Sequence, residues 1–162
     1  MSIIVEDGSV VNGANSYASE SDLSDYADAR GKTIEGTPET LLIRAMDFLE
    51  AQSFIGVKAN QHQPLQWPRD AVVIDGWAYT PSVLPDELKT AQLAIALAID
   101  EGSDPLEALE PGVKRKRVKA DTVESETEYR DGAASRTTSL SIPAALKKLI
   151  RGGGSQFAVA RG

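Results

Sequence analysis

The longest apolar pattern in the chain lies between Leu84 and Gly102, which reads LPDELKTAQLAIALAIDEG. Leucines and isoleucines alternate with alanines at its centre, a spacing that would also suit a strand. The flanks favour a helix, because Pro85 and two acids suit its positive first turn and Gly102 suits the position after its end. Apolar side chains then cover most of the helix circumference, so we expect a buried helix at the centre of a bundle.

Two amphipathic helices are expected before this central helix. The first is capped by Ser19 or Ser21 and runs through Arg30. The second begins at Pro38 and carries apolar residues at three- and four-residue spacing until about Ser53. Both helices therefore present one apolar face to the bundle.

Two segments lack a helical period. Residues 2–11 hold a short β-prone piece followed by turn-forming residues, which predicts a packed N-terminal arm. Residues 54–84 hold several prolines and both tryptophans, which predicts a long ordered loop wrapped on the bundle. Within it, Trp67 and Pro68 are expected to anchor the loop in the core. Loops of this length are uncommon in compact domains unless they are functional.

The character of the chain changes after residue 112. Val113 to Ala120 reads VKRKRVKA and Asp121 to Arg130 reads DTVESETEYR, which predicts a β-hairpin that sets a basic strand against an acidic one. Opposite charges across a ladder contribute about 0.2 to 1 kcal/mol per pair. The hairpin holds few apolar residues, so either it lies on its own bundle or a neighbouring copy completes its sheet. The side chains assigned to this contact between copies are Arg115, Arg117, Lys119, Glu124, Glu126 and Glu128.

The end of the chain combines a short helix with a tether. Ala144 to Ile150 is predicted to be helical, with lysines near its negative end. Three glycines follow as a flexible tether, after which Phe157 and Val159 alternate with small residues as in a strand. A segment of this kind suits docking elsewhere, and a frayed terminus is the alternative explanation.

The predicted fold class is mainly α. It is a small helical bundle around a central buried helix, with a protruding β-hairpin and an extended C-terminal tail. The predicted domain plan is a bundle with its long loop at 1–112, the hairpin at 113–131, a linker with a short helix at 132–151, and a docking tail at 152–162.

Composition and charge exclude several classes of protein. The chain of 162 residues has a net charge of -7 and no cysteine, so disulfides and thiolate metal sites are not available. Its acidity disfavours attraction of the whole surface to nucleic acid or to anionic lipid. The N-terminus carries no recognisable secretion signal, and the central apolar run is too short to cross a bilayer. We therefore expect no membrane partner and a protein that stays in the cell that makes it.

Candidate chemistry is sparse. His62 is the only histidine, so a catalytic triad and a zinc site both lack ligands, and no phosphate-binding glycine loop occurs. Paired acids such as Asp86 and Glu87 are explained by the start of a helix. We therefore expect no enzyme activity, no cofactor and no metal. The run from Lys114 to Lys119 is the one nucleic-acid signal, although pairing with the acidic strand is the favoured explanation.

Several motifs, in their order along the chain, resemble one known family. They are VEDG and GANSY within residues 5–30, LLIRAMDFLEAQ in the second helix, LQWPR at residues 65–69, and LPDELKTAQLAIAL in the central helix. This order resembles the small head-tail connector, or adaptor, proteins of tailed bacteriophages. Similar sequences are also described as DnaT-like single-stranded-DNA-binding proteins.

The resemblance to connectors implies a structural role in the neck of a virion, after assembly in the bacterial cytoplasm. It implies a ring, usually of twelve copies, beneath the portal protein and above a further neck or tail-completion protein. Double-stranded DNA would pass through without sequence-specific binding. The residues expected to dock on the portal are Phe157, Val159 and Arg161.

The alternative hypothesis is a single-stranded-DNA-binding accessory protein of replication. It rests on the basic run Lys114 to Lys119, with Trp77, Tyr79 or Tyr129 as surfaces on which bases stack. It predicts an affinity that falls steeply with salt.

Overall fold

The structure is a computed structural model that describes residues 2–103, 113–118, 125–129 and 144–151. Within these ranges the chain forms four helices and three two-stranded antiparallel sheets. Contacts divide the chain into two compact units, which are residues 1–105 with 140–162, and residues 106–139. The helix α4 (Ala144–Lys147), placed by the sequence in a linker, belongs to the first unit.

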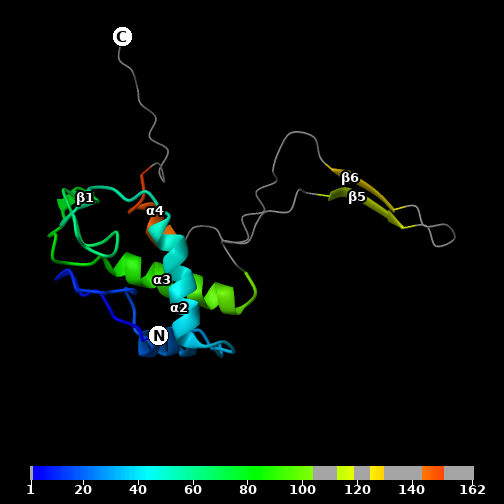
Figure 1. Cartoon of the computed structure of the whole chain (residues 1–162), viewed down its shortest axis with the longest axis horizontal. Helices are drawn as coiled ribbons and strands as arrows, with labels where there is room; N and C mark the ends of the chain where they lie inside the picture. Colours follow the sequence, from blue (N-terminus) through cyan, green and yellow to red (C-terminus); the bar gives the residue numbers. More distant parts are fainter. Residues whose placement is uncertain (1, 104–112, 119–124, 130–143, 152–162) are drawn as a thin grey trace, which may run out of the picture. The chain divides into compact units, whose positions relative to one another are not determined.

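The helix α3 (Asp86–Asp100) lies at the centre of the first unit and contacts the other three helices. Apolar side chains are buried around most of its circumference, as predicted, and Leu88 and Ile95 are fully inaccessible while Leu93 is nearly so. Figure 1 shows α2 (cyan) crossing α3 (green). Pro85 is the N-cap and not the first helical residue, because its extended backbone (φ -62°, ψ 135°) places it just before the helix.

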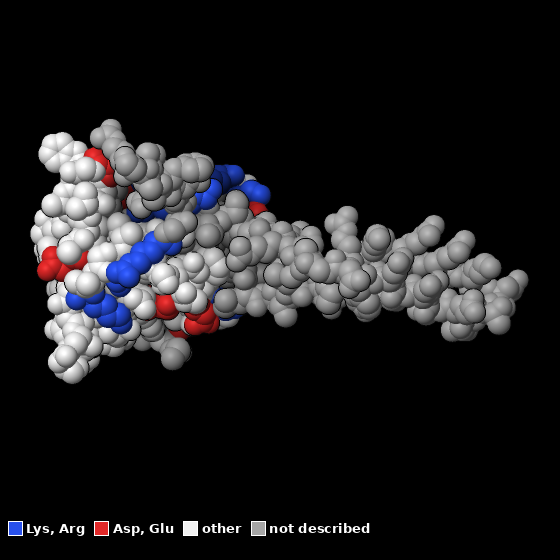
Figure 2. Space-filling model, turned by 90° about the horizontal axis from the view of Figure 1, so that it is seen from above, with Lys and Arg blue, Asp and Glu red and all other residues white. Residues whose placement is uncertain are grey.

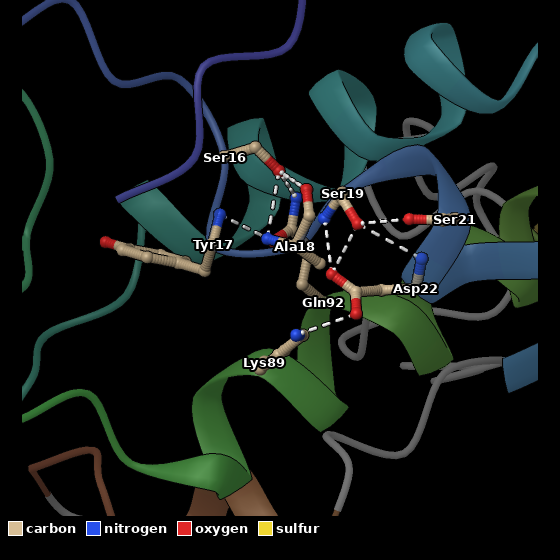
Figure 3. A network of polar contacts seen from close by, with 8 residues as sticks. All are labelled: Ser16, Tyr17, Ala18, Ser19, Ser21, Asp22, Lys89 and Gln92. Atoms are coloured by element: carbon tan, nitrogen blue, oxygen red, sulfur yellow. Dashed lines mark hydrogen bonds and ion pairs between the residues drawn. The ribbon is translucent and has the colours of Figure 1, made fainter. Parts of the chain in front are cut away.

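The helix α1 (Glu20–Asp28) begins with a reciprocal capping box (Figure 3). The Ser19 hydroxyl accepts a hydrogen bond from the Asp22 amide at 3.2 Å, and the Asp22 carboxylate accepts one from the Ser19 amide at 2.8 Å. Lys89 of α3 pairs with the same carboxylate at 2.8 Å. The helix ends at Asp28, two residues before the predicted end, and the cap thus also joins α1 to α3.

A buried glutamine ties the chain before α1 to the core. Gln92 of α3 accepts a hydrogen bond from the Tyr17 amide at 2.9 Å and donates one to the Ser16 hydroxyl at 2.8 Å (Figure 3). It also donates to the carbonyl of Leu42 at 3.2 Å, on the helix α2 (Pro38–Glu50). One side chain therefore fixes the register of three segments. The start of α2 is as predicted, and its end precedes the expected Ser53.

The segment 54–84 contains two small sheets, which corrects the prediction of a loop without regular structure. The strands β1 (Val57–Lys58) and β2 (Arg69–Asp70) pair with each other, as do β3 (Val73–Ile74) and β4 (Trp77–Ala78). Each strand has two residues, so no alternation could develop along the sequence. Asp75 and Gly76 join β3 to β4 with positive φ angles of 51° and 87°, as a tight hairpin requires.

The second unit contains an antiparallel hairpin of β5 (Val113–Val118) and β6 (Ser125–Tyr129). Its backbone register sets Arg115 opposite Glu128 and Arg117 opposite Glu126. Lys119 and Glu124 lie outside the described residues. The assignment of this ladder to a contact between copies stays a prediction.

The fold class is thus a mixture of helices and small antiparallel sheets, so the mainly α prediction holds only in part. No helix within the described ranges is long and apolar enough to span a membrane. The tail residues Phe157, Val159 and Arg161 lie outside those ranges.

Candidate nucleic-acid interface

The motif LQWPR packs one tryptophan into the core. Trp67 is fully buried, and its ring meets that of Phe54 edge to face, with centroids 6.0 Å apart and planes at 82°. The peptide bond between Trp67 and Pro68 is cis, and Pro68 is buried as well. The Trp67 amide donates a hydrogen bond to the Tyr17 hydroxyl at 3.1 Å. The segment that carries the small sheets is therefore anchored at its middle.

A carboxylate of α2 completes this anchor. The Tyr17 hydroxyl donates to Oε1 of Glu50 at 2.8 Å, and the Gln66 amide donates to both Glu50 oxygens, at 3.1 and 2.9 Å. Burial, together with the negative charge of Glu50, raises the pKa of Tyr17 above its usual range. Tyr17 therefore stays protonated and keeps its hydrogen-bond donor.

Arg69 holds in place the two residues that lead into β1. Its guanidinium donates from Nε to the Ile55 carbonyl at 2.7 Å and from Nη2 to the Gly56 carbonyl at 3.0 Å. Nη1 donates to the backbone and side-chain oxygens of Gln66, at 3.1 and 3.0 Å. Burial lowers the pKa of Arg69, and the positive charge of Arg151 lowers it further. The guanidinium groups of Arg69 and Arg151 thus lie close together beside Gly56.

The hairpin of β3 and β4 carries the second tryptophan outward. Trp77 is 79% exposed, whereas Ile74, its partner in the ladder, is buried against the core. The base of the hairpin is held by the Tyr79 amide, which donates to the Val72 carbonyl at 2.8 Å. The Trp77 indole thus projects from a short hairpin, whose strands are fixed by the buried Ile74 and by the hydrogen bond between Tyr79 and Val72.

The segment 144–151 brings cations to the same end of the first unit, where Figure 1 shows α4 (orange) beside the strands of segment 54–84. Phe54 and Ile150 form an antiparallel bridge, and the Arg151 amide donates to the Ser53 carbonyl at 2.7 Å. Lys148 pairs with Asp75 of the hairpin turn at 2.7 Å. Viewed from above in Figure 2, Lys and Arg side chains (blue) lie among wide uncharged areas (white). The ion pair between Lys148 and Asp75 places that lysine beside the turn of the hairpin that carries the exposed Trp77.

A family model described as "Putative DnaT-like ssDNA binding protein" matches residues 1–162. The chain belongs to this DnaT-like family. No curated protein and no solved structure matches the chain.

Membership of the DnaT-like family corrects the principal functional hypothesis. The description of the family names single-stranded DNA and no structural part of a virion, so the prediction of a head-tail connector is wrong. Nothing in the match supports a portal partner or a ring. The resemblance misled because its motifs specify the packing of the bundle, as the buried Trp67 and Gln92 show, and packing alone does not specify function.

The residues that the alternative hypothesis grouped together belong to two different units. Trp77 is exposed in the first unit, and Tyr79 is half-buried against its core. Tyr129 and the basic run up to residue 118 belong to the second unit, on β6 and β5. The stacking residue that the first unit offers is therefore Trp77.

Sequence reasoning missed the cations of segment 144–151 as part of a site. The helix dipole explains Lys147 and Lys148, and no local pattern relates them or Arg151 to Trp77. The hairpin itself did leave a signal, because Asp75-Gly76 between apolar residues is the strongest short-range pattern for a tight turn.

Other chemistry is limited in the described part of the chain. His62 is exposed, and its ring lies 2.9 Å from the Gln61 side chain. Among the residues that the structure describes, no three His, Cys, Asp or Glu side chains gather in a way that could hold a metal ion.

Proposed function

We propose that the chain binds single-stranded DNA, with Trp77 stacking on an unpaired base and the cations of segment 144–151 attracting the backbone. The exposure of Trp77 carries this proposal. An indole that is 79% exposed, on strands pinned by the buried Ile74, has little role in folding. Membership of the DnaT-like family supports the same conclusion.

Stacking on a protruding indole suits single strands in particular. In a duplex the faces of the bases are already covered by their neighbours, whereas an unpaired base can turn its face to an aromatic side chain. Stacking tolerates any base, because every base has a π face. The proposed binding is therefore selective for strand state and not for sequence.

The charge of the protein makes the cationic residues decisive. With a net charge of -7 the whole surface repels a polyanion, so binding needs local positive charge. Lys147, Lys148 and Arg151 are exposed at the end of the unit that also carries the Trp77 hairpin. Because phosphate contacts release counterions, we expect the affinity to fall steeply with salt.

The test is the fluorescence anisotropy of a labelled oligothymidylate of about 16 nucleotides, the upper end of common site sizes. We expect Trp77→Ala to weaken binding roughly 5- to 150-fold, since stacking contributes about 1 to 3 kcal/mol per base. Trp77→Phe keeps a smaller aromatic face and should retain part of the affinity.

The matched control is Val73→Ala, which removes an exposed apolar side chain from the partner strand without removing a ring. Binding by this variant should equal that of the parent protein. Equal binding by Trp77→Ala and the parent would show that the indole is not the stacking surface.

A further inference from the structure

We infer that Arg151, positioned beside the buried Arg69, forms a subsite for one phosphate group of the bound strand. This inference rests on the proposed function and states where the backbone runs once a base lies on Trp77. The inference concerns a single anion site. An experiment can therefore refute the site without refuting the stacking of a base on Trp77.

Two guanidinium groups converge on one backbone oxygen. Nη2 of Arg69 and Nη2 of Arg151 each donate to the Gly56 carbonyl, both at 3.0 Å. The two cationic groups are therefore within two hydrogen-bond lengths of each other. Like charges at this separation repel, and a phosphate bound to Arg151 would relieve the repulsion.

No carboxylate of the described residues forms an ion pair with either arginine. The charge of Glu50 reaches Arg69 without an ion pair, so it offsets part of the positive charge of that arginine. Within the part of the chain that the structure describes, Arg151 has no carboxylate partner. Arg151 is therefore the arginine of the pair that an external anion would partner.

The two arginines have different roles at the subsite. Arg69 is buried and uses four hydrogen bonds to fix its guanidinium, so it supplies a rigid positive charge. Arg151 is exposed, and of its five N–H donors one reaches Gly56. The other donors form no hydrogen bond with a described residue. Arg151 is therefore the residue that contacts the phosphate, in the forked geometry that guanidinium and phosphate groups share.

Lys148 is a poorer candidate although it lies on the same segment. Its ammonium group pairs with Asp75 at 2.7 Å, so a phosphate that approached Lys148 would also meet the negative charge of that carboxylate. The contrast between Lys148 and Arg151 provides an internal comparison. If charge alone mattered, Lys148 and Arg151 would contribute equally to phosphate binding. The geometry predicts a larger contribution from Arg151.

The subsite lies near the strand that leads into the hairpin. Gly56 packs so closely on the carbonyl oxygen of Asp70 and on the side chain of Val72 that an added Cβ would clash with both. Val72 directly precedes β3, whose turn leads to Trp77. Gly56, whose carbonyl both guanidinium groups contact, thus packs on the residue that leads into the hairpin of Trp77.

The experiment measures the binding of labelled oligothymidylate to the full chain at several salt concentrations. For single strands, the slope of log K against log salt changes by about 0.7 for each phosphate contact. We expect Arg151→Gln to reduce the slope by about that amount, and Lys148→Gln to change it much less. Arg151→Lys should keep the slope, because it keeps the charge. Trp77→Ala should weaken binding at every salt concentration with the slope unchanged.

A distant arginine provides the control. Arg30 stacks on Tyr26 just beyond α1 (blue), at the other end of the unit from α4 (Figure 1). Arg30→Gln removes the same charge from the protein and should leave the slope unchanged. An unchanged slope for Arg151→Gln, or an equal change for Lys148→Gln or Arg30→Gln, would overturn the subsite. In those cases the Trp77→Ala result still decides the proposed function separately.

Discussion

Replacing Tyr17 with phenylalanine tests the network that anchors the segment 54–84. The substitution keeps the buried ring and removes one hydroxyl, which donates to Glu50 at 2.8 Å and accepts from the Trp67 amide at 3.1 Å. The Trp67 amide then loses its partner inside the core, at a cost of about 1 to 3 kcal/mol. The lost hydrogen bond to a carboxylate adds to this cost, although the half-buried Glu50 still accepts from Gln66. We expect Tyr17→Phe to lower the free energy of unfolding by about 2 to 4 kcal/mol.

The assay is unfolding in urea, followed by circular dichroism at neutral pH. Tyr26→Phe is the matched control, because the Tyr26 hydroxyl has no hydrogen bond within the described part of the chain. That variant should unfold within about 0.5 kcal/mol of the parent protein. If Tyr17→Phe costs no more than Tyr26→Phe, the hydroxyl does not anchor the segment and the account of the network is wrong.

The stability of Tyr17→Phe should also depend on pH differently from that of the parent protein. Burial raises the pKa of Tyr17 in the folded state, whereas the Tyr17 hydroxyl of the unfolded chain ionises near pH 10. The contribution of the Tyr17 hydroxyl to folding stability is therefore fully present below pH 10. It is lost as the pH rises above 10, because Tyr17 then ionises in the unfolded chain and not in the folded one, which lowers the free energy of the unfolded state. Tyr17→Phe should show a smaller loss of stability than the parent between pH 9 and pH 11. An equal loss in both proteins would contradict the assignment.

Two further substitutions test the packing of the first unit. Trp67→Ala should lower the free energy of unfolding by about 3 to 5 kcal/mol, and a loss below about 1 kcal/mol would mean that the indole is not a core residue. Gly8 has a φ of +102°, and a Cβ there would clash with the Ser82 carbonyl, whereas Gly13 has a φ of +73° with more room around it. Gly8→Ala should therefore cost at least about 2 kcal/mol more than Gly13→Ala in urea unfolding, and equal costs would show that Gly8 does not pack on residue 82.

The helices could be predicted from the sequence, because local patterns of residues mark their positions. The apolar spacing in α2 extends over several turns, so its location follows from periodicity. The location of α3 follows from its flanks, Pro85 with the acids after it and Gly102, because its apolar alternation would also suit a strand. The cap of α1 was predicted as Ser19 or Ser21, and the structure shows Ser19, which forms a capping box with Asp22. These features are local, so the chain itself specifies them.

Features that depend on long-range contacts could not be predicted. The hydroxyl of Tyr17 meets Glu50 and the Trp67 amide, and Gln92 meets Ser16, across large separations in sequence. Trp67 and Trp77 lie in one segment of similar composition, and only the tertiary contacts bury the first and expose the second. The arginine pair was missed for the same reason, because Arg69 and Arg151 meet only through the carbonyl of Gly56.

The central claim is that Trp77 stacks on unpaired bases, and the intrinsic fluorescence of the protein tests it most directly. Trp67 is fully buried, so quenching of tryptophan emission by added oligothymidylate reports on Trp77. We predict saturable quenching at low salt, reversal of the quenching by added salt, and much weaker quenching by a duplex of the same length. Unchanged emission at low salt, or equal quenching by the duplex, would contradict the claim.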